Sequence, residues 1–165
     1  VAEPVSARLV SLPSDRRPRV NDLVLKRGRW PDVSRSAEVL VNESFAEAHH
    51  LEPGVHFPVL IRGQRKVVAV TGIASSPEFV FAVAPGDILP EPRRFGVLWM
   101  NREGLARALD LDGAFNDVVL RLQPDTDPAA VIATIDAMLA RFGGRGLYGG
   151  LRASCRRYFF SWPCS

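Results

Sequence analysis

The chain has 165 residues, of which 47% are hydrophobic and 24% charged, a composition typical of one folded domain. No apolar run approaches the ~18 residues that a membrane-spanning helix needs. The net charge of +3 comes from three arginines in residues 151–165, so residues 1–150 are neutral and lack the basic excess of a nucleic-acid-binding protein. The start at Val1, without Met or a leader pattern, suggests an excised piece whose targeting segment would lie elsewhere.

The first third of the chain predicts short strands and one short helix. A strand is expected at 5–12, where branched residues partly alternate with polar ones, and short strands are expected at 23–26 and 38–41. Asn42 or Ser44 can cap the helix that follows, and Ser44 with Glu47 has the spacing of a capping box. The apolar face of this helix would consist of Phe45, Ala48 and Leu51, and it would end at Pro53-Gly54.

The middle of the chain predicts a β-hairpin. Its strands are 55–61 and 67–73, and the sequence RGQRK, with Gly63, forms the turn between them. A buried strand is then expected at 95–100, a helix from a cap at Asn101 to Leu109, and another strand at 118–122.

The last helix has the clearest pattern. Thr126 or Asp127 can cap it, and Pro128 suits its first turn. Its apolar face is predicted to hold Val131, Ile132, Ile135, Met138, Leu139 and Phe142, and Gly143-Gly144 would stop it. The order of elements predicts an α+β fold, in which helices cover one side of a mixed β-sheet.

Between the hairpin and the next strand lies the sequence SSPEFVFAVAPGD, residues 75–87, which is unusually apolar for a loop. One interpretation is an exposed loop in which Phe79, Val80, Phe81 and Val83 contact a partner or a substrate, because exposed apolar patches often mark such contacts. The other is a buried β-strand with prolines at its ends. The sequence leaves both open.

No sequence motif for catalysis is present, and the chain is predicted to have no catalytic residue, metal or cofactor of its own. A small enzyme that uses the carboxylates of Glu78, Asp87 and Glu91 as acid and base is a further alternative. The adjacent His49 and His50 diverge on a helix and lack metal-ligand spacing. Trp30, Phe95, Trp99 and Phe115 are expected to be core residues rather than a binding site.

The end of the chain differs from the rest. Residues 151–165 have no helical or alternating pattern, and they hold both cysteines, Cys155 and Cys164, which could pair in a short loop. An aromatic and basic segment of this kind could anchor to a membrane surface. We favour the interpretation that it is artefactual or disordered.

Several short motifs occur in an order that resembles a known family. They are Gly28-Arg29-Trp30, the Phe45-Ala46 step, the turn Leu51 to Gly54, the strand end Val70 to Ile73, and then FGVLWM and FNDVVL. This ordered set, from about Ser6 to Gly150, resembles the extracytoplasmic domain of FtsX-like ABC-transporter permeases, the MacB-type periplasmic core domain. Residues 151–165 do not match that family.

The resemblance implies a domain at 1–150 with two lobes, one βαβ-like and one inserted at roughly 55–115. It implies a location on the extracytoplasmic face of the bacterial inner membrane, as part of an integral membrane protein. Expected partners are the transmembrane helices of the same permease, a separate ATP-binding subunit, and a periplasmic protein or lipid. A free-standing soluble binding module remains the alternative. The substrate class, the oligomeric state and the origin of residues 151–165 stay open.

Overall fold

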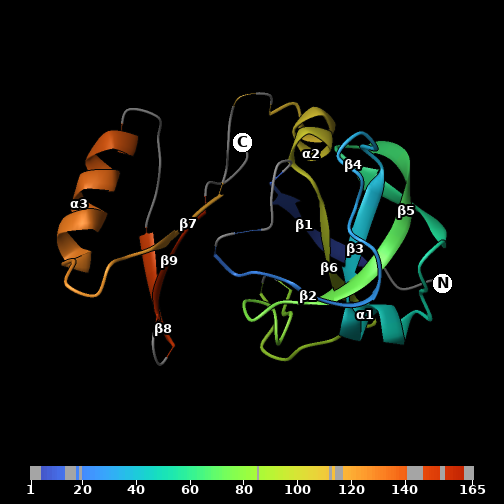
Figure 1. Cartoon of the computed structure of the whole chain (residues 1–165), viewed down its shortest axis with the longest axis horizontal. Coiled ribbons are helices and arrows are strands. Elements are labelled where there is room, and N and C mark those ends of the chain that lie inside the picture. Colours follow the sequence, from blue (N-terminus) through green and yellow to red (C-terminus); the bar gives the residue numbers. More distant parts are fainter. Residues whose placement is uncertain are drawn as a thin grey trace. The chain divides into compact units, whose positions relative to one another are not determined.

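The computed structural model describes residues 5–13, 18, 20–84, 86–111, 113, 117–140, 147–152 and 155–161. The contacts within the chain divide it into two compact units, Val1–Asp112 and Gly113–Ser165. We call them unit 1 and unit 2 and describe each by itself (Figure 1). The family domain predicted at 1–150, its inserted lobe at 55–115 and the origin of the 151–165 segment remain predictions, because they concern a relationship to other proteins.

Unit 1 is built on one six-stranded mixed sheet. Five strands follow the order β1-β6-β3-β5-β2, and β4 also pairs with β5. The β1–β6 and β3–β5 pairs are parallel, whereas β3–β6, β2–β5 and β4–β5 are antiparallel. The strands are β1 Ser6–Leu12, β2 Val24–Gly28, β3 Glu38–Asn42, β4 His56–Ile61, β5 Gln64–Ser75 and β6 Phe95–Asn101. This mixed sheet confirms the α+β fold predicted from the sequence.

Strand β5 organises the sheet because it is twelve residues long and has different neighbours along its length. Ala69 pairs with both Glu38 of β3 and His56 of β4, so these two strands lie on opposite edges of β5. Further along, β2 pairs with β5 from Gly72 to Ser75. The long strand therefore joins the β4 hairpin at its start to the β2 pairing at its end.

The hairpin of β4 and β5 turns more tightly than the sequence predicts. Ile61 pairs directly with Gln64, so only Arg62 and Gly63 form the loop. Both have positive φ angles, 50° and 75°, which is the conformation of a two-residue type I′ turn. Residues 64–66 of the predicted RGQRK turn are therefore part of β5.

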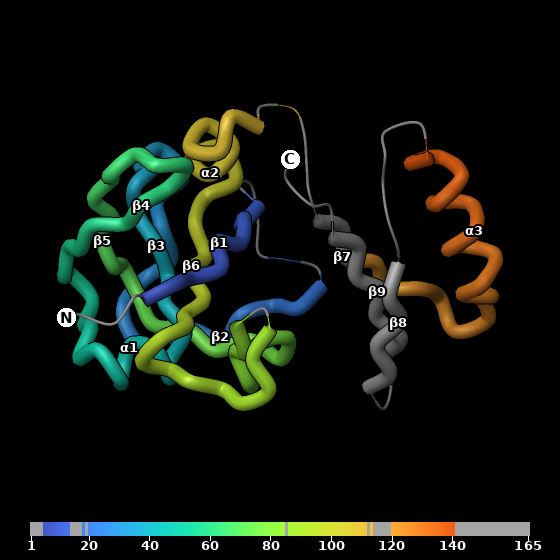
Figure 2. The backbone as a smooth tube through the Cα atoms, turned by 180° about the vertical axis from the view of Figure 1, so that it is seen from behind, coloured from blue at the N-terminus to red at the C-terminus, as the bar shows by residue number. Residues whose placement is uncertain are grey.

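Two helices cover one face of the sheet, as the sequence predicts (Figures 1 and 2). Helix α1, Glu43–Ala48, and helix α2, Arg102–Leu109, contribute Phe45 and Leu105 to a core. The strand residues in this core include Val39, Val41, Val68, Val70, Ile73, Leu98 and Met100. The sequence predicts Ala48 on the buried face of α1. In the structure Ala46 is buried instead, and Ala48 is half-buried.

The two helices begin differently. Asn101 caps α2, since its side chain accepts a hydrogen bond from the Glu103 backbone N–H, and this prediction is confirmed. The predicted side-chain cap of α1 is wrong. Asn42 precedes the helix, but its side chain accepts from the Val97 N–H at 2.7 Å and donates to Ser44 at 2.8 Å. Asn42 thus stands at the N-cap position of α1 but uses its side chain to tie β3 to β6, and Ser44 lies within the helix.

The other face of the sheet carries a second core, to which no described helix of unit 1 contributes a residue. Its buried residues are Leu12, Leu23, Leu40, Ala74, Ala82, Phe95, Val97 and Trp99. Trp99 is 2% exposed and Phe95 6%, so both are core residues as predicted, and Trp30 packs against them half-buried. Phe115 lies outside the described residues. The connection between β5 and β6 supplies Phe79, Ala82 and Ala84 to this core. On this face the apolar side chains that pack on the sheet therefore come from a loop, whereas on the other face they come from helices.

Unit 2 combines one helix with a three-stranded antiparallel sheet of order β7-β9-β8. Its elements are β7 Asp117–Arg121, α3 Pro128–Leu139, β8 Leu147–Arg152 and β9 Cys155–Ser161. Asp127 caps α3 by accepting from the Ala129 N–H, as predicted, whereas no residue of α3 is buried. Phe142, Gly143-Gly144 and Cys164 lie outside the described residues. The predicted pair of Cys155 and Cys164 therefore lies outside them as well. Strand β9 lies in the segment where the sequence shows no pattern.

Candidate contact loop and adjoining groove

The connection between β5 and β6, residues 76–94, is the longest described segment of unit 1 without a helix or strand. We call it the contact loop. It begins with a hydrogen-bonded turn, in which the Ser76 carbonyl accepts from the Phe79 N–H at 3.1 Å and the Ser76 hydroxyl from the Glu78 N–H at 3.2 Å. The Glu78 carboxylate accepts from the Asn21 amide at 2.6 Å. These bonds fix the start of the loop against the segment before β2.

Some side chains of the contact loop face the core and others face the solvent. Phe79 meets Trp99 edge-on, with ring centroids 6.1 Å apart, and the Arg8 guanidinium lies 5.7 Å from the Phe79 centroid. Ala82 is buried in the same core. Val80 and Phe81, by contrast, are 54% and 71% exposed. The loop is therefore anchored by one set of side chains and displays the other.

Both sequence interpretations of this segment need revision. None of its described residues forms a β-strand, so the buried-strand interpretation is wrong. Of the four predicted contact residues, Val80 and Phe81 are exposed, Val83 is half-buried and Phe79 faces the core. The role of these residues in contact with a partner stays a prediction.

The sequence reasoning missed the most exposed apolar residues of the loop. Ile88 is 93% exposed and Leu89 75%, just beyond a turn in which Asp87 N–H donates to the Ala84 carbonyl at 3.0 Å. A signal was available, because two large aliphatic residues between Gly86 and Pro90 have no strand or helix pattern that would bury them.

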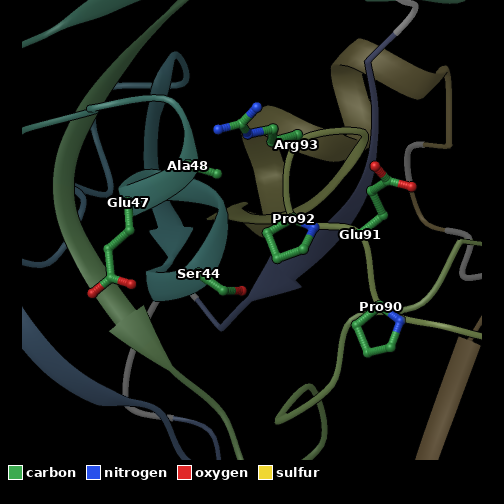
Figure 3. Close-up of a pocket in the computed structure, with 7 residues that line it drawn as sticks. All are labelled: Ser44, Glu47, Ala48, Pro90, Glu91, Pro92 and Arg93. Atoms are coloured by element: carbon green, nitrogen blue, oxygen red, sulfur yellow. The ribbon is translucent and has the colours of Figure 1, made fainter.

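The end of the contact loop forms one wall of an open groove of ≈ 550 Å³. Its lining consists of Ser44, Glu47, Ala48, Pro90, Glu91, Pro92 and Arg93 (Figure 3). The carboxylates of Glu47 and Glu91 point away from each other, with Pro92 between them (Figure 3). A 2.9 Å hydrogen bond between the His49 Nε2 and the Arg93 carbonyl holds the two walls together.

The three carboxylates of the enzyme alternative have separate environments. Glu78 is bound to Asn21, Glu91 lines the groove, and Asp87 is exposed at the turn of the loop. Among the described residues, no hydrogen bond joins Asp87 to Glu91. Nothing in this arrangement supplies the matched acid and base that such chemistry requires.

The histidines have structural contacts. The His49 ring packs on Phe45 at 4.4 Å between centroids, and the His56 Nδ1 is 3.0 Å from the Gly54 carbonyl oxygen. Glu52, which is close to His56 in the sequence, pairs with Arg27 at 2.8 Å. In the part of the chain that the structure describes, no three His, Cys, Asp or Glu side chains are grouped to hold a metal ion.

Three of the motifs that carry the family resemblance meet at one place, where β2 pairs with β5. Gly28 and Gly72 pair there, and a Cβ on Gly28 would overlap the Thr71 carbonyl oxygen and approach Pro53. A Cβ on Gly72 would lie 2.8 Å from the carbonyl oxygens of Arg27 and Arg29. We call this place, with Gly28, Pro53, Gly54 and Gly72, the glycine corner.

The rest of these motifs completes the corner through hydrogen bonds. Gly54 N–H donates to the Val70 carbonyl at 2.7 Å, and Arg29 N–H to the Thr71 carbonyl at 2.9 Å. Two glycines are needed because the backbones approach more closely than any side chain permits. The motifs are therefore residues that determine the fold, rather than residues that do chemistry.

A buried carboxylate lies next to the glycine corner, and the sequence reasoning did not single it out. Glu38 is 5% exposed; it accepts two hydrogen bonds from the Arg29 guanidinium, at 2.6 and 2.8 Å, and one from the Asp32 N–H at 2.8 Å. The bonds from Arg29 outweigh burial and, with that from Asp32, lower the pKa of Glu38 from 4.5 to about 2. The Arg29 side chain therefore locks the loop after β2 onto the start of β3.

Comparison with known proteins adds no relative. No protein-family model matches the chain, and no curated protein or solved structure is significantly similar to it. In the described residues, no helix is both long and apolar enough to cross a bilayer.

Proposed function

We propose that this chain is the extracytoplasmic domain of an FtsX-like ABC-transporter permease subunit. In this role the domain couples ATP hydrolysis by a separate cytoplasmic subunit to export or extraction of a substrate, which is a lipid, lipoprotein, peptide or drug, or to a periplasmic partner. The domain does no catalysis of its own. Its position is the extracytoplasmic face of the inner membrane, joined to transmembrane helices of the same permease.

The observation that carries this proposal is the glycine corner. Three motifs that span more than forty residues of sequence, at Gly28, Pro53-Gly54 and Gly72, come together in one tightly packed place. Chance similarity of scattered short motifs does not require them to form one structural unit. Their convergence supports the idea that the ordered set marks a shared fold.

The contact loop suits the outer surface of such a domain. Its base is held by Phe79, Ala82 and the turn at Ser76, and its exposed apolar residues are presented on that base. A fixed base lets a movement of the whole domain reach whatever the loop touches. This is what a domain that transmits motion needs, and a flexible loop would not supply it.

The parent gene tests the proposal most directly. Reading the coding sequence on both sides of this segment, in all frames, should reveal apolar runs of about 20 residues before Val1 and after Gly150. A fusion of alkaline phosphatase within the segment, in living cells, should then be active, since that enzyme requires the extracytoplasmic side. A short gene without such runs, together with an inactive fusion, would leave the soluble binding module as the function.

A functional test separates contact from stability. In the parent permease, Phe81→Ser together with Ile88→Ser should abolish transport, and the melting temperature of the purified domain should stay unchanged. Val33→Ser is the matched control, because Val33 is 53% exposed in unit 1 but lies outside the contact loop. Normal transport by the double variant would exclude the contact loop from the mechanism.

A further inference from the structure

Two runs of six consecutive exposed residues occur in the described part of unit 1. One is 32–37, between β2 and β3, and the other is 86–91, in the contact loop. The other exposed runs described in unit 1 are shorter. Endoproteases attack exposed chain first, so these two runs are the places where the folded protein could be cut.

The first run, 32–37, is held by hydrogen bonds along its backbone. The Arg35 N–H donates to the Asp32 carbonyl at 3.0 Å, and the Ser34 N–H donates to the Asp32 carboxylate at 2.8 Å. The Asp32 N–H in turn donates to the buried carboxylate of Glu38 at 2.8 Å. A protease binds its substrate as an extended strand through these same backbone groups, so a cut here must first open the turn.

The second run, 86–91, is bonded only at its ends among the described residues. The Asp87 N–H donates to the Ala84 carbonyl at 3.0 Å. The Glu91 carbonyl accepts from two N–H groups that follow it in the chain, at 2.9 and 3.0 Å. The middle of the run therefore keeps backbone groups that a protease can bind.

The prolines leave one suitable bond in the middle of this run. Ile88 and Leu89 are 93% and 75% exposed, and neither forms a backbone hydrogen bond with a described residue. The Leu89–Pro90 and Glu91–Pro92 bonds are poor substrates, because proline has no N–H and its ring fixes the backbone. The Ile88–Leu89 bond, by contrast, joins two aliphatic side chains that a protease pocket can hold.

The sheet holds the chain on both sides of this bond. Strand β6 follows the contact loop, and it pairs with β1 and β3, which both precede the loop. The remaining strand pairs of the sheet, β2–β5, β3–β5 and β4–β5, lie wholly before the loop. A cut after Ile88 therefore breaks no strand pairing, and the fragments 1–88 and 89–165 remain joined through β6.

We propose that the Ile88–Leu89 bond is a processing site, cut in the folded protein by an endoprotease whose pocket takes an aliphatic side chain. Water adds across the bond: its hydroxyl joins the Ile88 carbonyl carbon, and the Leu89 nitrogen keeps the electron pair of the broken C–N bond and takes a proton. The cut separates the exposed part of the contact loop from β6 and leaves the sheet of unit 1 intact. The inference goes beyond the proposed function and does not depend on it.

Limited proteolysis of the purified chain tests the site. Proteinase K, which accepts aliphatic side chains on the carbonyl side of the bond, should first give the fragments 1–88 and 89–165, identified by mass spectrometry. The fragments should elute together in native size-exclusion chromatography and separate only in denaturant. The Val33–Ser34 bond is the internal control, because Val33 is 53% exposed and suits the same protease but lies in the hydrogen-bonded run.

A variant tests the choice of bond. Leu89→Pro turns it into a bond to proline and should slow the cut after Ile88 by at least about tenfold. Val33→Ser should leave that rate unchanged. Urea at concentrations below the unfolding transition should change the rate by less than about twofold, because the cut needs no global unfolding. Circular dichroism of each variant checks that it is folded.

Three results would overturn the proposal. A first cut at Val33–Ser34 would mean that exposure alone selects the site. A rate that rises with urea in step with unfolding would mean that the folded chain is not the substrate. Fragments that separate in native chromatography would mean that the pairing of β6 does not hold the cut unit together.

Discussion

The glycine corner and the contact loop lie at the same end of β5, yet they are opposites in packing. At the corner there is no room for a single methyl group on Gly28 or Gly72. In the loop, sixteen residues after Gly72 in the sequence, Ile88 is 93% exposed. The difference teaches that this unit separates the residues that fix its fold from those that face outward. Substitutions should therefore divide into those that change stability and those that change only contacts.

The largest expected effect is at the corner. Gly28→Ala combines a clash against backbone with a positive φ of 81°, and should destabilise unit 1 by at least about 3 kcal/mol in urea unfolding. Gly63→Ala is the matched control, because Gly63 also has positive φ but open space around it. It should cost only about 1 kcal/mol. Equal costs at the two sites would mean that backbone conformation, and not crowding, governs the corner.

The next largest effect is the difference in free energy of unfolding between variants of the two phenylalanines of the contact loop. Phe79→Ala removes the ring that packs on Trp99 and should cost about 2 kcal/mol, somewhat less than the roughly 3–5 kcal/mol of a fully buried Phe. Phe81→Ala should change the free energy of unfolding by less than about 0.5 kcal/mol. Thermal melts of the two variants check that Phe79 anchors the loop and Phe81 does not, and a Phe81 variant as unstable as the Phe79 variant would contradict this.

The buried carboxylate beside the corner predicts a dependence on pH. The folded pKa of Glu38 is about 2, below the unfolded value of 4.5, so its contribution is fully present above pH 4.5. It should be lost as pH falls from about 4.5 towards 2. Glu38→Gln should cost about 1–3 kcal/mol at pH 7 and flatten this part of the stability curve. If the variant lost stability below pH 4.5 as steeply as the wild type does, other carboxylates would be the cause of the loss.

The smallest expected effect concerns the helix starts. Asn101→Ala removes the hydrogen bond to the Glu103 N–H and should destabilise unit 1 by about 1 kcal/mol. Asn42→Ala should cost more, because it leaves the buried Val97 N–H without its acceptor. Urea midpoints of the two variants would settle their order, and a smaller effect for Asn42 would contradict the tie between β3 and β6.

Local patterns predicted most elements of unit 1, and what they missed depends on distant contacts. Short apolar runs locate β3 and β6, and Asn101 caps a helix because the hydrogen bond is local. Asn42 looks the same in sequence, but its side chain bonds to a strand more than fifty residues away. Glu38 lies at the start of an apolar strand, and only the fold reveals that Arg29 reaches it. The exposure of Ile88 likewise depends on distant contacts, because the second core takes up only some of the apolar residues of the loop.

The pairing of β1 with β6 has a consequence for synthesis of the chain. Ser6 pairs with Phe95 and Leu12 with Asn101, so β1, at the start of unit 1, pairs among the described strands only with β6, near the end of the unit. Until that later strand is made, β1 has no hydrogen-bonding partner and its apolar residues have no core. Closing so long a loop is slow. A nascent chain of this kind is open to aggregation during that interval, and a binding factor that shields β1 would raise the yield of folded protein.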